Sequence, residues 1–197
     1  MKNDFFITGL FYELNELKCR KYMNIRKKGT ELEIPDLLVV MMNPGKSKPI
    51  DGIDNNNRET EAIPDQTQNQ IMRIMINCEF EYARILNLSD ARETSSEEFY
   101  QMIPQFESEK IAHSIFDNRR KDDLEIFLVK DVATIFAWGV DNALTELAKT
   151  AIEKIETKNI YGIKKEKTEF AYYHPLPPNS HKQKEWVEKI TEQIKTA

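Results

Sequence analysis

The chain has few of the residues that bind metals or form disulfides. It contains only two cysteines and three histidines among 197 residues. Cys19 and Cys78 lie far apart in apolar or mixed sequence, so we expect reduced thiols rather than a disulfide. The histidines and cysteines do not stand at metal-ligand spacing, which argues against zinc and iron–sulfur sites. We therefore predict a protein that uses no metal and no other cofactor.

Long apolar runs and excess positive charge are also missing. The sequence never approaches the roughly 18 apolar residues that a membrane span needs. It begins M-K-N-D-F-F-I-T-G, without the continuous apolar core of a signal peptide, so we expect a cytoplasmic protein without a membrane partner. The formal net charge is −5, which argues against a broad basic surface for duplex nucleic acid. A local basic cleft remains compatible with that charge.

The most informative apolar stretch is Leu37–Met42, whose six unbroken apolar residues predict a strand buried on both faces. Asn43-Pro44-Gly45 ends it, because proline removes a backbone donor and glycine permits positive φ. Ligands of parallel sheets sit just beyond the carboxyl ends of strands. We therefore expect a functional site at this turn.

The remaining elements alternate between strand and helix. Further strands are expected at residues 82–88, 131–138 and 169–173, with a short one at 160–163. Helices are expected from Pro64-Asp65 to Cys78, after the cap at Ser95, within 106–129, at 142–156, and after the cap at Ser180. Residues 5–17 fit either a helix or a strand, 18–28 an edge strand, and 46–64 a long polar loop that could form a flap.

This order predicts an α/β fold, a single domain over residues 1–197 in which a central, mainly parallel sheet lies in a three-layer α/β/α sandwich. Right-handed crossovers would bring the strand ends to one edge. Four unusual segments would meet there. They are Asn43-Pro44-Gly45, residues 87–92 from Asn87 to Arg92, Trp138-Gly139, and His174-Pro175.

Several of these residues have a structural explanation beside a functional one. Asn43 could serve only the turn, but Asn87 at a second strand end suggests a pair of amides that read the edge of a base. Arg92 could hold an anion or pair with a nearby carboxylate such as Asp90. Asp65 is most simply a helix cap, although it could face the same cleft.

The tryptophan and glycine pair favours the structural explanation. Trp138 fits a core residue better than a stacking platform, and Gly139 fits a turn better than a phosphate site. Gly45-Lys46-Ser47 is similar to the end of a phosphate-binding loop. That loop needs a glycine where Val40 stands, and a helix that Pro49 prevents, so we exclude it.

His174 is the sharpest single candidate, because it follows an apolar strand and precedes Pro175-Leu176-Pro177-Pro178, which fixes its loop. It could be catalytic or a satisfied structural histidine. His113 and His181 lie in charged helical sequence and are expected on the surface.

Together the four segments resemble the uracil-DNA glycosylase superfamily. The likeness lies in N-P-G after the first core strand, L-N-L at a strand end, I-F-A-W-G before a helix, and a late H-P-L-P. The chain is more similar still to an uncharacterised bacterial and phage family in or near that superfamily. That match adds Asp65-x-Thr67, Asn87-Leu88 and Arg92.

The resemblance implies binding of a nucleobase in a nucleic acid or nucleotide, with hydrolysis of its N-glycosidic bond. It implies that Asn43 positions the attacking water, that His174 donates to the departing base, and that Asn87 reads the base edge. The other residues of the implied ligand site are Pro44, Gly45, Ser47, Asp65, Leu88, Arg92, Trp138, Gly139 and Pro175. The strongest glycosylases carry aspartate in place of Asn43, which implies slower hydrolysis here.

Two other functions fit the same pattern. The chain could be a catalytically inactive nucleotide- or nucleic-acid-binding module, with a possible protein partner in phage–host conflict. It could also be a nucleoside deoxyribosyltransferase-like enzyme, which would use Asp65 or Asp90 as a carboxylate nucleophile. Fold alone does not decide among these functions.

Overall fold

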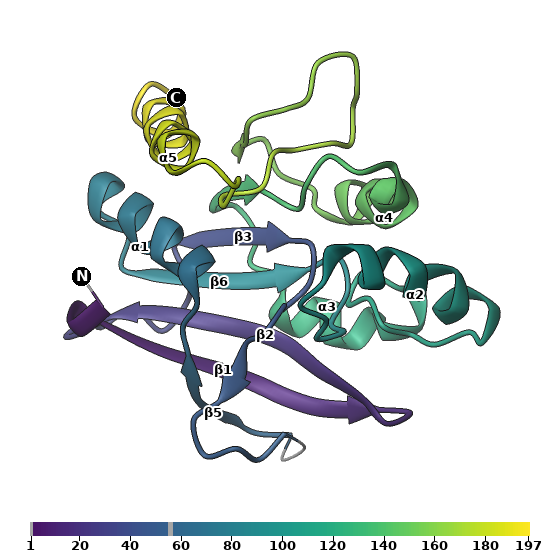
Figure 1. Ribbon diagram of the computed structural model, residues 1–197. Helices are drawn as coiled ribbons and strands as arrows, with labels where there is room; N and C mark the ends of the chain where they lie inside the picture. Colours follow the sequence, from purple (N-terminus) through teal and green to yellow (C-terminus); the bar gives the residue numbers. More distant parts are fainter. Residues whose placement is uncertain (1, 55–56) are drawn as a thin grey trace.

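A computed structural model of the protein describes residues 2–54 and 57–197 (Figure 1). Its strands are β1 (Phe5–Leu14), β2 (Leu17–Lys27), β3 (Leu37–Met41), β4 (Lys48–Pro49), β5 (Glu59–Ile63), β6 (Tyr82–Asn87), β7 (Ala133–Phe136) and β8 (Ile160–Tyr161). Its α-helices are α1 (Gln66–Cys78), α2 (Ser96–Ser108), α3 (Lys121–Phe127), α4 (Thr145–Lys154) and α5 (Ser180–Lys195). These strands form one sheet in the order β4-β5-β1-β2-β6-β3-β7-β8.

The predicted buried strand is confirmed as β3. All five of its residues are buried, and it pairs in parallel with β6 on one side and with β7 on the other. An unbroken apolar run suits this position because helices cover both faces of the sheet. β3 therefore carries its C-terminal turn, Asn43-Pro44-Gly45, to the middle of the parallel strands.

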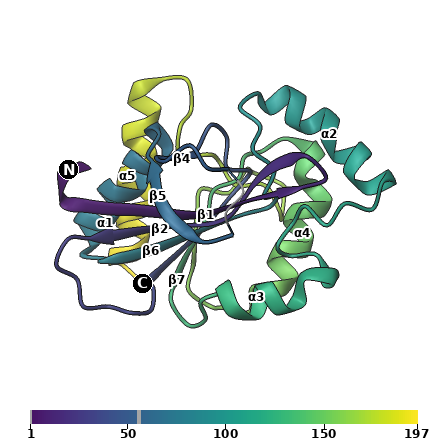
Figure 2. The same ribbon diagram turned by 90° about the horizontal axis from the view of Figure 1, so that it is seen from below.

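Two hydrophobic cores lie on opposite faces of the sheet. One is closed by α1 and α5, and the other by α2, α3 and α4. Figure 2 shows α1 and α5 grouped apart from the other three helices. The α/β class is confirmed by this arrangement. Among the described residues, no helix is long and apolar enough to cross a membrane.

The predicted mainly parallel sheet is wrong. Four of the seven strand pairings are antiparallel and three are parallel. The antiparallel half begins with residues 5–27, a long hairpin that turns at Asn15 and Glu16, both at positive φ. Side chains on both faces of β1 are buried, so its sequence lacks the alternation typical of a strand.

The predictions for residues 18–28 and 46–64 fail because both segments belong to the antiparallel half of the sheet. The segment 18–28 is not an edge strand, because β2 lies between β1 and β6. The segment 46–64 is not only a loop, because it contains β4 and β5, which complete the antiparallel half. Residues 55 and 56, which belong to this segment, lie outside the described part.

Residues 169–173 do not form the predicted fourth core strand. β8 takes that place beside β7, as the short strand expected at 160–163. Tyr172 instead makes isolated bridges to Gly139 and Lys164. Its ring packs edge-on against Phe136 and Trp138, at centroid distances of 5.3 and 5.2 Å. Side-chain packing, rather than a strand ladder, thus brings the segment before His174 to the sheet.

The helical predictions hold better than their boundaries. Asp65 caps α1 and Ser95 caps α2, whereas the cap of α5 is Asn179 rather than Ser180. The segment 106–129 is only partly helical. His113, expected on the surface, is buried against the ring of Phe106, while His181 is exposed as predicted.

Candidate functional site

A cavity of about 390 Å³ opens beyond the carboxyl ends of β3 and β7. Of the strands that follow β3 in parallel, β6 lies on one side of it and β7 on the other, so the cavity lies where the order of the parallel strands reverses. Open parallel sheets bind ligands at such a position. Its lining comprises Arg20, Met41, Met42, Asn43, Pro44, Gly45, Lys46, Asp65, Gln66, Thr67, Gln68, Thr94, Ser96, Tyr100, Trp138, Gly139, His174 and Leu176.

The cavity gathers seven of the twelve residues that the sequence singled out. They are Asn43, Pro44, Gly45, Asp65, Trp138, Gly139 and His174. Five others lie outside its lining. Ser47, Leu88 and Pro175 are buried beside it, Arg92 pairs with Asp54, and Asn87 lies underneath the turn. Three of the four predicted segments thus contribute to the lining, whereas 87–92 lies against Asn43 and contributes none.

Asn43 is fixed by the loop that follows β6. Its Nδ2 donates to the backbone carbonyls of Glu93 at 2.7 Å and Ala91 at 3.3 Å. These two acceptors require an amide at position 43, since a carboxylate would face both carbonyls without a proton to share. The side-chain oxygen remains as the acceptor that Asn43 can offer to a ligand or a water.

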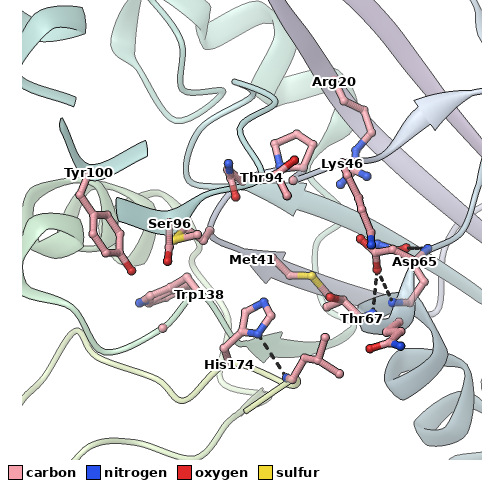
Figure 3. Close-up of a pocket in the computed structure, with 18 residues that line it drawn as sticks. Arg20, Met41, Lys46, Asp65, Thr67, Thr94, Ser96, Tyr100, Trp138 and His174 are labelled. Carbon is pink, nitrogen blue, oxygen red and sulfur yellow. Dashed lines mark hydrogen bonds between the residues drawn. The ribbon is translucent and has the colours of Figure 1, made fainter. Parts of the chain in front are cut away.

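His174 reaches the cavity from the loop before α5. Its Nδ1 accepts a hydrogen bond from the backbone N–H of Leu176 at 3.2 Å. Burial lowers the pKa of His174, although the carboxylate of Asp65 acts in the opposite direction. A neutral ring whose Nδ1 is an acceptor carries its proton on Nε2. Figure 3 shows this second nitrogen turned into the cavity, where it is a hydrogen-bond donor.

Asp65 serves both the helix and the cavity. One oxygen, Oδ1, accepts the backbone N–H groups of Thr67 at 2.7 Å and Gln68 at 3.3 Å. The Gln68 side chain accepts from the Asp65 backbone N–H at 2.6 Å, which completes a capping box. The cap is therefore confirmed, and the same carboxylate lines the cavity.

The wall opposite Asp65 is aromatic. Trp138 is 1% exposed, and its Nε1 donates to the carbonyl of Phe170 at 2.7 Å, so it is a core residue with one edge in the cavity. Gly139 adopts a φ of +116°, which favours glycine, and exchanges backbone hydrogen bonds with Tyr172. Tyr100 of α2 adds a second ring (Figure 3). The sequence analysis missed Tyr100 because its helix contributes only one turn to the site.

Arg20 was also missed, and a β-bulge explains why. Leu10 pairs with Tyr22, but Phe11 pairs with Arg20, which leaves Lys21 as the extra residue. A bulge reverses the alternation of side chains along a strand. It turns Arg20 to the face of Phe11 and Met23, which α1 covers, rather than to the face of Tyr22. Reading the alternation from sequence assigns the wrong face to this residue.

Arg20 is buried without an ion-pair contact to a carboxylate. Its side chain is 1% exposed, and burial lowers its pKa to about 10 even though Asp65 and Asp90 act to raise it. Within the described residues, no carboxylate oxygen lies within 4.0 Å of its guanidinium, and Nε has no hydrogen-bond partner. Nη1 lies 3.8 Å from the sulfur of Met23, a weak acceptor.

Asn87 supports Arg20 instead of reading a base. With the amide oriented to satisfy its neighbours, its oxygen accepts from Nη2 of Arg20 at 3.2 Å. Its nitrogen donates to the backbone carbonyl of Asn43 at 3.3 Å. Asn87 is fully buried, so its predicted role at the edge of a bound base is wrong. Asn87 thus links the side chain of Arg20 to the backbone of Asn43.

Arg92, the residue that the sequence predicted to bind an anion, is already paired. It forms an ion pair with Asp54, which also binds Lys18 at 2.6 Å, and its guanidinium lies 5.4 Å from the ring centre of Phe11. Among the described residues, no group of three His, Cys, Asp or Glu side chains could hold a metal ion. The charged groups that line the cavity are therefore Arg20, Lys46 and Asp65.

Comparison with known proteins identifies the family. Residues 24–176 match the model of a family described as "Protein of unknown function (DUF1643)", which spans most of the chain, so the protein belongs to this family. The match covers β3 through His174 and leaves out most of the hairpin that carries Arg20. No curated protein and no solved structure matches the chain.

Proposed function

We propose that this protein binds a nucleobase-containing ligand, in a nucleic acid or a nucleotide, and hydrolyses its N-glycosidic bond in the cavity beyond β3 and β7. The single observation that carries the proposal is His174. It presents a neutral ring whose Nε2 proton faces the same cavity as Asn43. The resemblance to uracil-DNA glycosylases supplies the reaction, and the placement of these two residues supports it.

The chemistry requires a donor for the departing base. When the bond between the sugar C1′ and the base nitrogen breaks, the electron pair goes to the base and positive charge develops on the sugar. An N–H donor stabilises the base anion most when the protein already holds it in place, so that no dipole has to reorient during the reaction. His174 meets this requirement because burial lowers its pKa and keeps the ring neutral.

The opposite side of the bond requires water and negative charge. The free acceptor of Asn43 can orient a water whose oxygen bonds to C1′, while the water proton leaves to solvent and the base takes up another. The carboxylate of Asp65, in the same cavity, can stabilise the cationic sugar. Tyr100 and the edge of Trp138 offer apolar surface to a planar base.

One specific observation keeps a second reaction in view. A deoxyribosyltransferase-like enzyme needs a carboxylate nucleophile, and Asp65 lines the cavity. The other candidate, Asp90, is unsuitable because it is fully buried in an ion pair with Arg120 at 2.6 Å. In that reaction the Asp65 oxygen would bond to C1′ as the first base leaves with the electron pair and takes up a proton, and a second base would then displace the carboxylate and lose its proton.

The test is to incubate the protein with single- and double-stranded oligonucleotides that contain uracil or a modified base, and to detect abasic sites. We expect His174→Ala to lower the rate by about 100-fold, the usual contribution of one positioned donor. His181→Ala is the matched control, because this exposed histidine lies outside the cavity. Equal signals from wild type and His174→Ala would reject the hydrolysis.

Two further results would separate the alternatives. If Asp65→Ala abolishes base exchange while His174→Ala retains it, the transferase is favoured. If wild type binds an oligonucleotide but produces no abasic sites, the protein is a binding module. The slope of affinity against salt then measures how many phosphates it contacts.

A further inference from the structure

We infer that the cavity contains a phosphate subsite, in which Arg20 and Lys46 hold a phosphate of the ligand while the base lies toward Tyr100, Trp138 and His174. The position given to the base rests on the proposed function. The position given to the phosphate does not. It adds a requirement to the substrate class: a nucleotide or a nucleic acid rather than a free base or nucleoside.

The first support is the missing partner of Arg20. Removing a guanidinium from water costs several kcal/mol, and folded proteins offset that cost with carboxylates and hydrogen bonds. Arg20 is 1% exposed, yet among the described residues its hydrogen-bond acceptors are the amide oxygen of Asn87 and the sulfur of Met23. Three of its five N–H donors have no acceptor among these two. An anion in the cavity would supply the missing acceptors.

The second support is the local charge. Arg20 and Lys46 carry two positive charges into the cavity lining, and Asp65 is the only carboxylate among the lining residues, so the lining is net positive when His174 is neutral. The whole chain carries a net charge of −5. A positive cavity in an acidic protein attracts anionic ligands through its electrostatic field, in addition to any direct contacts.

The residue types favour phosphate. The planar fork of arginine matches phosphate oxygens in a bidentate way, and lysine adds a mobile point charge. Figure 3 shows Arg20, Lys46 and Asp65 on one side of the cavity, with Tyr100, Trp138 and His174 on the other. A ligand with a phosphate at one end and a base at the other fits both sides.

Asn87 couples the two ends of the site. It holds the guanidinium of Arg20 through its oxygen and the turn at Asn43 through its nitrogen. The orientation of the arginine fork is therefore set by the same side chain that supports the proposed water-positioning residue. A fixed fork loses little freedom on binding, which favours affinity.

The first experiment measures thermal unfolding with inorganic phosphate against sodium chloride at equal ionic strength. Wild type should gain stability with phosphate, because a ligand that binds only the folded state raises the unfolding temperature. Arg20→Met should lose that gain. Lys46→Met should reduce it, while Lys48→Met should not, since both lysines are exposed but only Lys46 lines the cavity.

The second experiment uses calorimetry to compare uridine, uridine 5′-monophosphate and a short single-stranded oligonucleotide. We expect the phosphate to tighten binding by about tenfold or more, the usual effect of charge-assisted hydrogen bonds. Arg20→Met should remove that advantage and leave uridine binding unchanged. The ratio of mononucleotide to oligonucleotide affinity identifies the source of the phosphate.

The outcomes separate the two proposals. Phosphate binding that depends on Arg20, without preference for a base, would keep the subsite and reject the nucleobase function. Uridine binding that depends on His174, with no gain from phosphate, would keep the nucleobase function and reject the phosphate subsite. Arg20→Lys and the two lysine variants test phosphate binding independently of the stability of Arg20→Met. Equal phosphate effects in wild type, Lys46→Met and Arg20→Lys would overturn the inference.

Discussion

Two arginines of this protein, one buried and one largely covered, have opposite surroundings. Arg120 precedes α3, is 10% exposed, and binds Asp90 at 2.6 Å and Asp123 at 2.9 Å. Arg20 of β2 is 1% exposed and has no carboxylate partner among the described residues. Burial would lower the pKa of both, but the anions around Arg120 raise its pKa, whereas the pKa of Arg20 falls to about 10.

The contrast lies in the partners of each cation. Around Arg120 each charged side chain has a partner of opposite charge: Lys21 binds Asp123 at 2.8 Å, and the hydroxyl of Tyr12 adds a hydrogen bond to Asp90 at 2.7 Å, although Oδ1 of Asp90 has no hydrogen-bond partner among the described residues. Arg20 lines an open cavity, and its Nε–H donor has no hydrogen-bond partner among the described residues. We interpret the first as part of the folded framework and the second as a site completed by a ligand.

Each region also has a histidine. His113 lies near Arg120, and its Nδ1 is 2.8 Å from the hydroxyl of Ser89, inside the core. His174 lies on the cavity opposite Arg20 and turns a nitrogen into it. Both have lowered pKa values because of burial. Titration of His113 should therefore affect folding, whereas that of His174 should affect ligand binding.

The largest expected effect is on the Arg120 region. Arg120→Met leaves the carboxylate of Asp90 buried without its cation, and breaking a buried pair costs about 3–5 kcal/mol. Denaturant unfolding should measure a loss of this size. Arg120→Met combined with Asp90→Asn should recover part of it. A loss below about 1 kcal/mol in the single variant would contradict a structural role for Arg120.

A smaller effect should come from His113. Burial lowers its pKa to about 4, below the ordinary value of 6.5, so the unfolded chain binds the extra proton first. Stability is therefore greatest above pH 6.5 and is lost as the pH falls toward 4, by about 3 kcal/mol for a shift of this size. His113→Phe should flatten the curve between pH 6.5 and 4. His181→Ala, at an exposed site, should leave it unchanged.

The sequence predicts the parallel half of the fold well and the antiparallel half poorly. Leu37–Met42 is apolar throughout because both of its faces are covered, and its end at Asn43 follows from proline and glycine. The hairpin of β1 and β2 lacks a clear signal because both faces of β1 are also partly buried, and its polar members mask the strand pattern.

The candidate site divides in the same way. Asn43, Trp138 and His174 were found because each stands where an apolar segment ends in a turn, and Asp65 because it can cap the helix that follows. Arg20 was missed because the bulge at Lys21 reverses its direction, and bulges have no reliable sequence signal. Asn87 was placed at the correct strand end but serves Arg20, since only tertiary structure shows its partners.

The most direct test compares the unfolding free energies of wild type and Arg20→Met, with and without uridine 5′-monophosphate. Without ligand, we expect Arg20→Met to be at least as stable as wild type, because the change removes a buried charge that has no ion-pair contact. With ligand, only wild type should gain stability. A loss of several kcal/mol in Arg20→Met without ligand, like that expected for Arg120→Met, would show that Arg20 is structural and would contradict the ligand-completed site.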